Sequence, residues 1–460
     1  MPDHALSTGR RELLEGWGRH PRLYAESYRL EERAQAAPLL SHLKGRAPVL
    51  AYGLGRSYGD AALTHEGAAL KTRALNRVLS FDPESGWVKV EAGVSIAELI
   101  QRYLPLGFFP PVVPGTQFVT IGGAIANDIH GKNHHVDGTI ADHVRCVELL
   151  LASGELVTCD AAHNSELFWA TVGGLGLTGL ILSAELKLTP VGGPGIEMES
   201  IRVRDLDHFF EVSESSAGFT HTVSWIDCSK RGPGMGRGIY LRGRHCDAPP
   251  KPRLLGRVAG AISPLMRVPF SMPNMLLNPL TVKAFNELYF RKHPEGTLEQ
   301  VTHYEPFFFP LDFVKRWNLI YGRRGFLQYQ LVVPRSPDHR AIREVLTEIS
   351  EAGMGSFLAV IKEFGDQRHP HLSFPMPGVT LALDFPHYGP PLLALLSRLD
   401  RVVIEAGGRV YLGKDARLPQ AHFVEMYPDW EGWRALKERW DPEQVFRSAL
   451  SDRLGLTTPR

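Results

Sequence analysis

The stretch Thr120–His135, TIGGAIANDIHGKNHH, constrains this chain more than any other. Gly122 and Gly123 stand before a short apolar run, and glycine lets a backbone approach a flat or anionic ligand closely. His130 and Lys132 follow and would place titratable groups beside that ligand. Alone, the stretch could equally be a glycine-rich turn with a solvated histidine cluster. It predicts a ligand site only in combination with other glycine clusters.

Three glycine clusters are separated along the chain, at Gly53–Gly59, Gly115–Gly123 and Gly173–Gly179. None has the GxxxxGK[ST] order of a Walker A loop, and none is a convincing GxGxxG dinucleotide fingerprint. Three such loops could still line one long ligand that carries a pyrophosphate and flat rings. An extended dinucleotide is the natural candidate.

Strand-like runs, glycine turns and helical patterns alternate through the first part of the chain, which indicates an α+β fold. Ser95 and Glu98 form a capping-box pattern that predicts a helix after Ser95. Other predicted helices cover Asn164–Ala170 and His339–Ala352, and predicted strands cover Trp87–Val94, Val144–Ala152, Leu180–Leu188, Phe326–Val333 and Val379–Phe385.

The turn PVGGP at Pro190–Pro194 is a plausible linker. We therefore predict an N-terminal domain over 1–193, a second domain over 194–408, and a C-terminal segment over 409–460.

The length, composition and net charge of the chain argue against several functions. A length of 460 residues with 43% hydrophobic and 22% charged residues predicts a globular protein of two or three domains, and a net charge of +1 argues against nucleic-acid binding. The four widely spaced cysteines predict neither a disulfide framework nor a zinc site. Without an apolar signal region or a membrane-spanning run, we expect a cytoplasmic protein that can bind the surface of the inner membrane.

The segment 229–292 holds twelve Lys or Arg and two acidic residues, Asp247 and Glu287, interleaved with apolar side chains. It can be interpreted as an insertion with a solvated basic face, or as a basic-apolar surface for an anionic lipid.

Five motifs together resemble the vanillyl-alcohol-oxidase-type flavoproteins, and within them the oxidases of decaprenylphosphoryl-ribose. The motifs are GLGRSYGD (Gly53–Asp60), PGTQFVTIGGAIANDIHGKNHH (Pro114–His135), ELFWATVGGLGLTG (Glu166–Gly179), FLQYQLVVP (Phe326–Pro334) and GGRVYLGKDAR (Gly407–Arg417). The resemblance implies a two-domain α+β flavoprotein. An FAD-binding domain, completed by the C-terminal segment, would join a substrate domain built on an antiparallel sheet.

The resemblance also implies which residues bind FAD. They are Gly53, Gly55, Arg56, Ser57, Tyr58, Gly59, Asp60, Gly115, Thr120, Ile121, Gly122, Gly123, Asn127, Asp128, Ile129, His130, Ile181 and Tyr411. Backbone N–H groups in glycine turns suit the pyrophosphate. Some relatives bond the flavin covalently to a histidine of the first loop. This loop offers Arg56 and Tyr58 instead, so we predict non-covalent FAD.

By the same resemblance, Lys414 and His130 would be catalytic, with Lys414 acting either as base or as hydrogen-bond donor. Substrate would contact Lys132, Tyr58, Gln330, Lys362 and Trp225, although Lys362 and Trp225 could also be a surface charge and a core aromatic. A metal site on His130, His134 and His135 is disfavoured, because Gly131 and Asn133 oppose the helix it would need.

The resemblance implies FAD-dependent oxidation of the 2-hydroxyl of a polyprenyl-phosphoryl ribose to the 2-keto sugar lipid. An NAD(P)H-dependent short-chain reductase would then complete the epimerisation to the arabinose donor for cell-wall glycan. The alternatives are an aldonolactone- or alditol-type FAD oxidase of a soluble sugar, and a flavin-binding scaffold without turnover.

Overall fold

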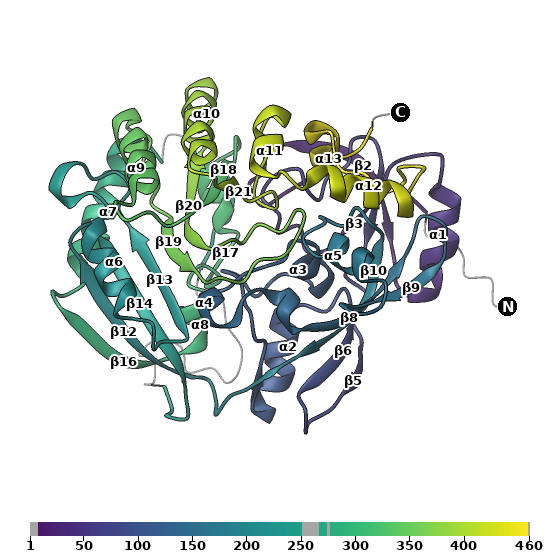
Figure 1. The fold of residues 1–460 in the computed structure, drawn as a ribbon, viewed down its shortest axis with the longest axis horizontal. Coiled ribbons are helices and arrows are strands. Elements are labelled where there is room, and N and C mark those ends of the chain that lie inside the picture. The colour runs from purple at the N-terminus through teal and green to yellow at the C-terminus, as the bar shows by residue number, and fades with distance from the viewer. Residues whose placement is uncertain (1–7, 251–265, 274–276, 459–460) are drawn as a thin grey trace.

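In a computed structural model that describes residues 8–250, 266–273 and 277–458, the chain forms three main sheets with helices around them (Figure 1). The first has the order β1-β2-β4-β3 and the second β5-β6-β10-β8-β9. Their strands are β1 (Arg10–Glu15), β2 (Arg22–Arg29), β3 (Val49–Tyr52), β4 (Ala68–Lys71), β5 (Val78–Phe81), β6 (Trp87–Glu91), β8 (Val144–Leu150), β9 (Leu156–Cys159) and β10 (Leu180–Lys187).

Short helices accompany these two sheets: α1 (Ala36–Leu43), α2 (Ile96–Tyr103), α3 (Ile121–Ala126), α4 (His134–Asp137) and α5 (Ser165–Thr171). The capping box before α2 is confirmed, because the Glu98 N–H donates to Ser95 Oγ at 3.3 Å and the Ser95 N–H donates to Glu98 Oε2 at 2.8 Å. The pair β7 (Phe108–Phe109) and β11 (Thr189–Pro190) precedes the third sheet.

The third sheet has eight strands in the order β16-β12-β14-β13-β19-β20-β18-β21, and all of its paired neighbours are antiparallel. They are β12 (Gly195–Val203), β13 (His221–Ile226), β14 (Gly238–Cys246), β16 (Thr297–His303), β18 (Phe326–Val333), β19 (Ala359–Phe364), β20 (Gly378–Pro386) and β21 (Arg409–Val410). Nearby lie β15 (Met266–Arg267), β17 (Val314–Lys315), α6 (Leu206–Glu214), α7 (Pro279–Lys292), α8 (Tyr304–Phe308), α9 (Arg340–Ala352) and α10 (Pro390–Glu405).

The segment 229–292 is not an insertion along its whole length. β14 lies within it and is an inner strand of the eight-stranded sheet, between β12 and β13. Two of its cations are already paired with acids outside the segment. Arg242 pairs with Glu199 at 2.6 Å and Arg244 with Glu197 at 2.8 Å, and both acids lie on β12. The parts of the segment at 251–265 and 274–276 lie outside the described residues.

The C-terminal segment returns to the N-terminal sheets, where Figure 1 shows its helices in yellow beside the purple strands. It forms α11 (Gln420–Met426), α12 (Trp430–Trp440) and α13 (Ala449–Leu454). The Val49 N–H donates to the Val445 carbonyl at 2.8 Å, and Trp433 Nε1 donates to the Ala170 carbonyl at 2.8 Å. One apolar core therefore joins the C-terminal helices, α9, α10 and the eight-stranded sheet to residues of the N-terminal part.

Within the described residues, no helix is both long and apolar enough to cross a bilayer.

Candidate active site

The first glycine loop follows β3 and packs closely against two other segments. A side chain at Gly53 would meet Thr120 Oγ1, and one at Gly59 would meet the Asp415 carbonyl. The Tyr58 N–H donates to the Gly413 carbonyl at 3.3 Å. Close backbone contact of this kind requires glycine. The loop 53–60, the central stretch and the turn 411–415 thus meet at one place.

Helix α3 is short and is held at both ends by hydrogen bonds of the central stretch. Thr120 caps it, with its Oγ1 accepting from the Gly123 N–H at 3.2 Å. At its other end Asn127 Nδ2 donates to the Gly123 carbonyl at 2.8 Å, and Tyr411 Oη donates to the Asn127 carbonyl at 2.7 Å. Tyr411 therefore reaches the central stretch from the C-terminal segment, where the resemblance placed it.

The junction of these segments, which we call the FAD cleft, has polar groups that fit FAD. Among the described residues, Arg56 Nε, Gln117 Nε2 and His130 Nδ1 are buried without a protein hydrogen-bond partner. Buried polar groups seldom remain unpaired, so these atoms indicate a polar ligand. A side chain at Gly115 would meet no atom within 4 Å, which leaves room beside the backbone. The Arg56 guanidinium lies 3.9 Å from the centre of the Trp17 ring and lines the same loop.

Several of the predicted cofactor residues form the walls of the cleft. The Asp128 carboxylate accepts from Ser373 Oγ at 2.6 Å, while Ile121, Ile129 and Ile181 are buried in the core. The Ser57 carbonyl accepts from the Trp17 N–H at 2.8 Å. These residues would shape the FAD site through their backbone and their packing.

Asp60 connects the first glycine loop to the C-terminal helices. Arg453 on α13 lies 2.7 Å from the Asp60 carboxylate and 2.9 Å from that of Asp415, and both carboxylates are buried.

We expect Arg453→Gln to weaken FAD binding by about tenfold or more, because it leaves two buried carboxylates without a cation beside the loop. Flavin fluorescence released on dilution measures this change, and Arg434→Gln on the exposed face of α12 is the control. Equal flavin retention in both variants would contradict the assignment.

His130 is buried in the central stretch. Its Nε2 lies 2.9 Å from Gln330 Nε2 on β18, so with the Gln330 amide donating, the imidazole proton resides on Nδ1. Burial, followed by the charges of Lys362, His134 and Lys414, holds the pKa of His130 well below its usual value. A neutral imidazole with an unpaired N–H can orient a substrate oxygen.

Three half-buried lysines converge around His130. Lys132 Nζ donates to the Phe308 carbonyl at 3.1 Å, and Lys362 Nζ donates to the Gly131 carbonyl at 3.2 Å. Burial lowers the pKa of Lys132 to about 8, and burial together with the other two lysines lowers that of Lys362 to about 7. Such amines can bind an anion when protonated and accept a proton when neutral.

Lys414 lies beside Tyr58, with its Nζ 4.0 Å from the centre of the ring. Burial lowers the pKa of Lys414 to about 8, against the opposing charge of Asp384. Asp384 is a buried carboxylate on β20 that accepts from Gln328 Nε2 at 2.6 Å, and burial raises its pKa to about 7. Sequence reasoning missed Asp384, although a carboxylate within the apolar run Val379–Phe385 was a usable signal.

Trp225 is the remaining predicted substrate contact, and it packs against α7. Trp225 on β13 donates from Nε1 to the Phe357 carbonyl at 2.9 Å, and its ring meets Tyr289 of α7 at 4.7 Å. His134 and His135 point elsewhere: His134 Nδ1 accepts from the Gly365 N–H at 3.1 Å, and His135 Nε2 lies 2.9 Å from the Phe219 carbonyl.

Comparisons with known proteins first give the class. Residues 34–160 match the FAD binding domain family, and residues 379–454 match the D-arabinono-1,4-lactone oxidase family. Both matched regions contribute to the cleft. The chain is an FAD-dependent oxidoreductase of the vanillyl-alcohol-oxidase type, with the two-domain α+β architecture expected for it.

Full-length similarity then gives the family. The chain is 38% identical over 451 residues to decaprenylphosphoryl-beta-D-ribose oxidase of Mycolicibacterium smegmatis, which covers 96% of this chain and 97% of that protein. The chain belongs to this family. It is also 30% identical over 172 residues to L-gulonolactone oxidase of Scyliorhinus torazame, covering 37% and 38% of the two chains. Cytokinin dehydrogenase 1 of Arabidopsis thaliana is 30% identical over 144 residues, covering 31% and 25%.

Proposed function

We propose that this protein oxidises the 2-hydroxyl of a polyprenyl-phosphoryl ribose to the 2-keto sugar lipid, as the first half of epimerisation to the arabinose donor for cell-wall glycan. The observation that carries the proposal is that the charges of Lys362 and Lys414 act on His130, while Lys132 and Lys414 act in turn on Lys362, so that three lysines form one cluster near His130. A phosphorylated sugar needs both a cationic site for its phosphate and a group that takes a hydroxyl proton. The three lysines can supply both.

Bound FAD would accept the hydride that leaves the sugar carbon. The chain's own residues handle the proton and the orientation. Neutral Lys414 would take the hydroxyl proton at Nζ, and the Tyr58 ring beside it would restrict the position of the sugar. Gln330 fixes the ring of His130, which would hold the sugar through Nδ1–H. Lys132 and Lys362 would bind the phosphate, whose negative charge favours the ammonium form of both amines.

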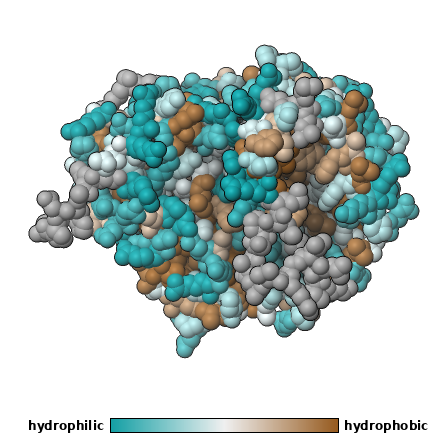
Figure 2. All heavy atoms as spheres, turned by 180° about the vertical axis from the view of Figure 1, so that it is seen from behind, coloured by the Kyte–Doolittle hydropathy of each residue, from teal (hydrophilic) through white to brown (hydrophobic). Residues whose placement is uncertain are grey.

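The exposed side of α7 supports a membrane-borne substrate. Leu280 and Leu288 are 79% and 71% exposed, two turns apart, with Lys283 and Arg291 next to them. Figure 2 shows hydrophobic atoms scattered among hydrophilic ones on the face opposite to that of Figure 1. Exposed leucines flanked by cations suit an anionic bilayer surface. Tyr289 of the same helix contacts Trp225, so this surface adjoins the proposed substrate site.

We expect Leu280→Ser/Leu288→Ser to reduce binding to vesicles of anionic phospholipid by about tenfold or more, because the two leucines lose their apolar insertion. Vesicle co-sedimentation of the holoenzyme measures this. The control is Leu13→Ser/Leu156→Ser, which removes two leucines that are 47% and 52% exposed elsewhere. Equal losses in the two double variants would show that α7 has no special part in binding.

The proposal includes the cytoplasmic face of the inner membrane as the location, and an NAD(P)H-dependent short-chain reductase as the partner that completes epimerisation.

The proposal also includes non-covalent FAD, because the loop 53–60 presents Arg56 and Tyr58 rather than a histidine. Acid precipitation should therefore release all the flavin into the supernatant. Yellow colour retained in the washed pellet would contradict this expectation.

The proposed function is tested by anaerobic titration of the holoenzyme with a polyprenyl-phosphoryl ribose while the oxidised flavin band is recorded. Bleaching by this lipid, and not by free ribose or alditols, is the expected result.

The match to D-arabinono-1,4-lactone oxidase over 379–454 favours a second candidate, an oxidase of a soluble sugar or lactone. Bleaching by soluble sugars would select that candidate. No bleaching by any of them would overturn both oxidase functions.

A further inference from the structure

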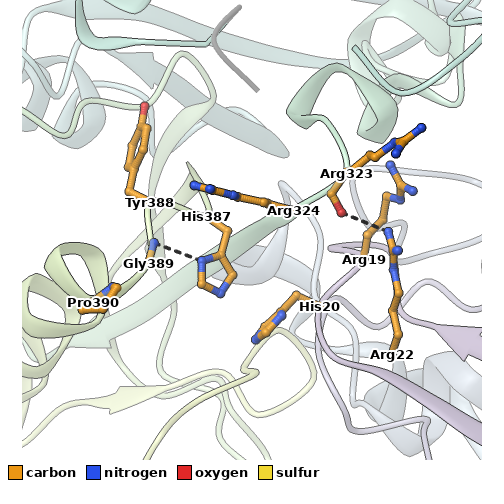
Figure 3. A pocket seen from close by; sticks show the side chains of 9 residues that line it. All are labelled: Arg19, His20, Arg22, Arg323, Arg324, His387, Tyr388, Gly389 and Pro390. Carbon is orange, nitrogen blue, oxygen red and sulfur yellow. Dashed lines mark hydrogen bonds between the residues drawn. The ribbon is translucent and has the colours of Figure 1, made fainter. Parts of the chain in front are cut away.

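A cavity of about 530 Å³ lies where the connection between β1 and β2 meets two loops of the eight-stranded sheet (Figure 3). Arg19, His20 and Arg22 come from the first segment, and Arg323 and Arg324 precede β18. His387 follows β20. None of the residues that line this cavity belongs to the FAD cleft or to the lysine cluster described above.

Positive charge exceeds negative charge in this cavity. Arg19 and Arg22 share one carboxylate, that of Glu15, at 3.3 and 2.8 Å. Within the described part of the chain, Arg324 has no ion-pair partner. Pro390, the first residue of the 16-residue helix α10, also lines the cavity, and the positive end of the helix dipole adds to the field. Crowding guanidinium groups costs free energy unless an anion offsets their repulsion.

Two of the guanidinium groups are held by hydrogen bonds before any ligand arrives. Arg19 Nη1 donates to the Gly322 carbonyl and to Ser271 Oγ, each at 2.9 Å. Arg22 Nη2 donates to the Arg323 carbonyl at 3.1 Å. Figure 3 shows the Arg324 side chain extending toward the loop of His387. Guanidinium groups fixed in this way lose little entropy on binding and match phosphate oxygens in pairs.

The two histidines add neutral donors. Their rings are 4.4 Å apart, edge to face. Burial, then the charges of His387 and Arg22, lowers the pKa of His20 to about 4, so its ring is neutral with one N–H. His387 Nδ1 accepts from the Gly389 N–H at 3.1 Å, which leaves its Nε2 as the hydrogen-bond donor. The cavity therefore offers donors and cations, with one carboxylate that is already paired.

We infer that this cavity is a second anion site of the protein, which binds the phosphate group of a phosphate ester through Arg22, Arg324 and the neighbouring imidazoles. The phosphate can belong to a phospholipid headgroup or to a soluble ester, since both present the same oxygens. The inference does not rest on the proposed sugar-lipid substrate, because none of these residues belongs to the lysine cluster.

The test uses the holoenzyme of Arg22→Gln/Arg324→Gln. Its control, Arg340→Gln/Arg401→Gln, removes the same two charges from exposed positions on α9 and α10. One arm measures binding of inorganic phosphate by calorimetry. The other measures co-sedimentation with phosphatidylglycerol vesicles, with phosphatidylcholine vesicles as reference. We expect the cavity variant to lose about tenfold in affinity in at least one arm, while the control changes less than twofold.

Loss in the vesicle arm assigns the site to a lipid headgroup, and loss in the phosphate arm alone assigns it to a soluble ester. If neither arm changes, or if the control loses as much as the cavity variant, the inference is wrong. Anaerobic bleaching by the sugar lipid is recorded on both variants. Unchanged bleaching shows that the fold and the FAD cleft are intact, so a failure of this inference is distinct from a failure of the proposed function.

Discussion

Lys414→Met should slow anaerobic reduction of the bound flavin by polyprenyl-phosphoryl ribose by about a thousandfold, because a positioned general base contributes about 10²- to 10⁴-fold. Lys414 is the lysine beside Tyr58, and burial lowers its pKa to about 8, which provides neutral amine near neutral pH. Stopped-flow absorbance at saturating substrate measures the rate. Lys89→Met on β6 is the control, and the flavin of this variant should be reduced at the wild-type rate.

The pH dependence tests whether Lys414 acts as the base. The neutral amine is the form that accepts a proton, and it accumulates as pH rises through about 8. The reduction rate of the wild type should therefore rise between pH 6.5 and 9 and then level off, and this rise should be absent from Lys414→Met. A wild-type rate that falls over the same range would identify the ammonium form as active and assign Lys414 to hydrogen bonding.

Asp400→Asn should lower the free energy of unfolding by about 3–5 kcal/mol, since removing one partner of a buried ion pair leaves the other uncompensated. Asp400 on α10 is fully buried. It accepts from Tyr329 Oη at 3.0 Å, from Arg417 Nη1 at 2.6 Å and from His422 Nδ1 at 2.9 Å. These partners come from the eight-stranded sheet and from the C-terminal segment, so one carboxylate holds three elements together.

Urea unfolding of the holoenzyme, followed by tryptophan fluorescence, measures the loss. Glu348→Gln is the matched control, because it removes a carboxylate from the exposed pair with Arg398 between α9 and α10. An exposed pair contributes within about 1 kcal/mol. Equal shifts of the urea midpoint in the two variants would show that burial of Asp400 adds nothing.

Local signals in the sequence predicted individual elements well. The capping box at Ser95 placed the start of α2, and the apolar runs placed β18 and β20. The order of the eight-stranded sheet was not predictable in this way, because it depends on pairing between distant strands. The same distance misled the interpretation of 229–292. The count of cations and acids within the segment could not include the acidic partners of Arg242 and Arg244, which lie on β12.

The candidate site likewise combines residues that local sequence signals identify with contacts that only the fold reveals. His130, Lys132 and Lys414 lie in the motifs, Lys362 was assigned by the resemblance alone, and the fold brings the four residues close together. Nothing local indicates that Gln330 would meet His130, because the two are 200 positions apart. Asp384 was visible as a carboxylate in an apolar strand, and only the fold shows that it lies near Lys414.

The contact between Asp60 and Arg453 has a consequence for biosynthesis. During translation the glycine loops leave the ribosome long before α13 is made, so the nascent chain carries Asp60 without its cation. The wall formed by residues 411–415 is likewise missing at that stage. We therefore expect flavin uptake to follow synthesis of the C-terminal segment, and ribosomes stalled before residue 411 should hold chains that do not capture FAD.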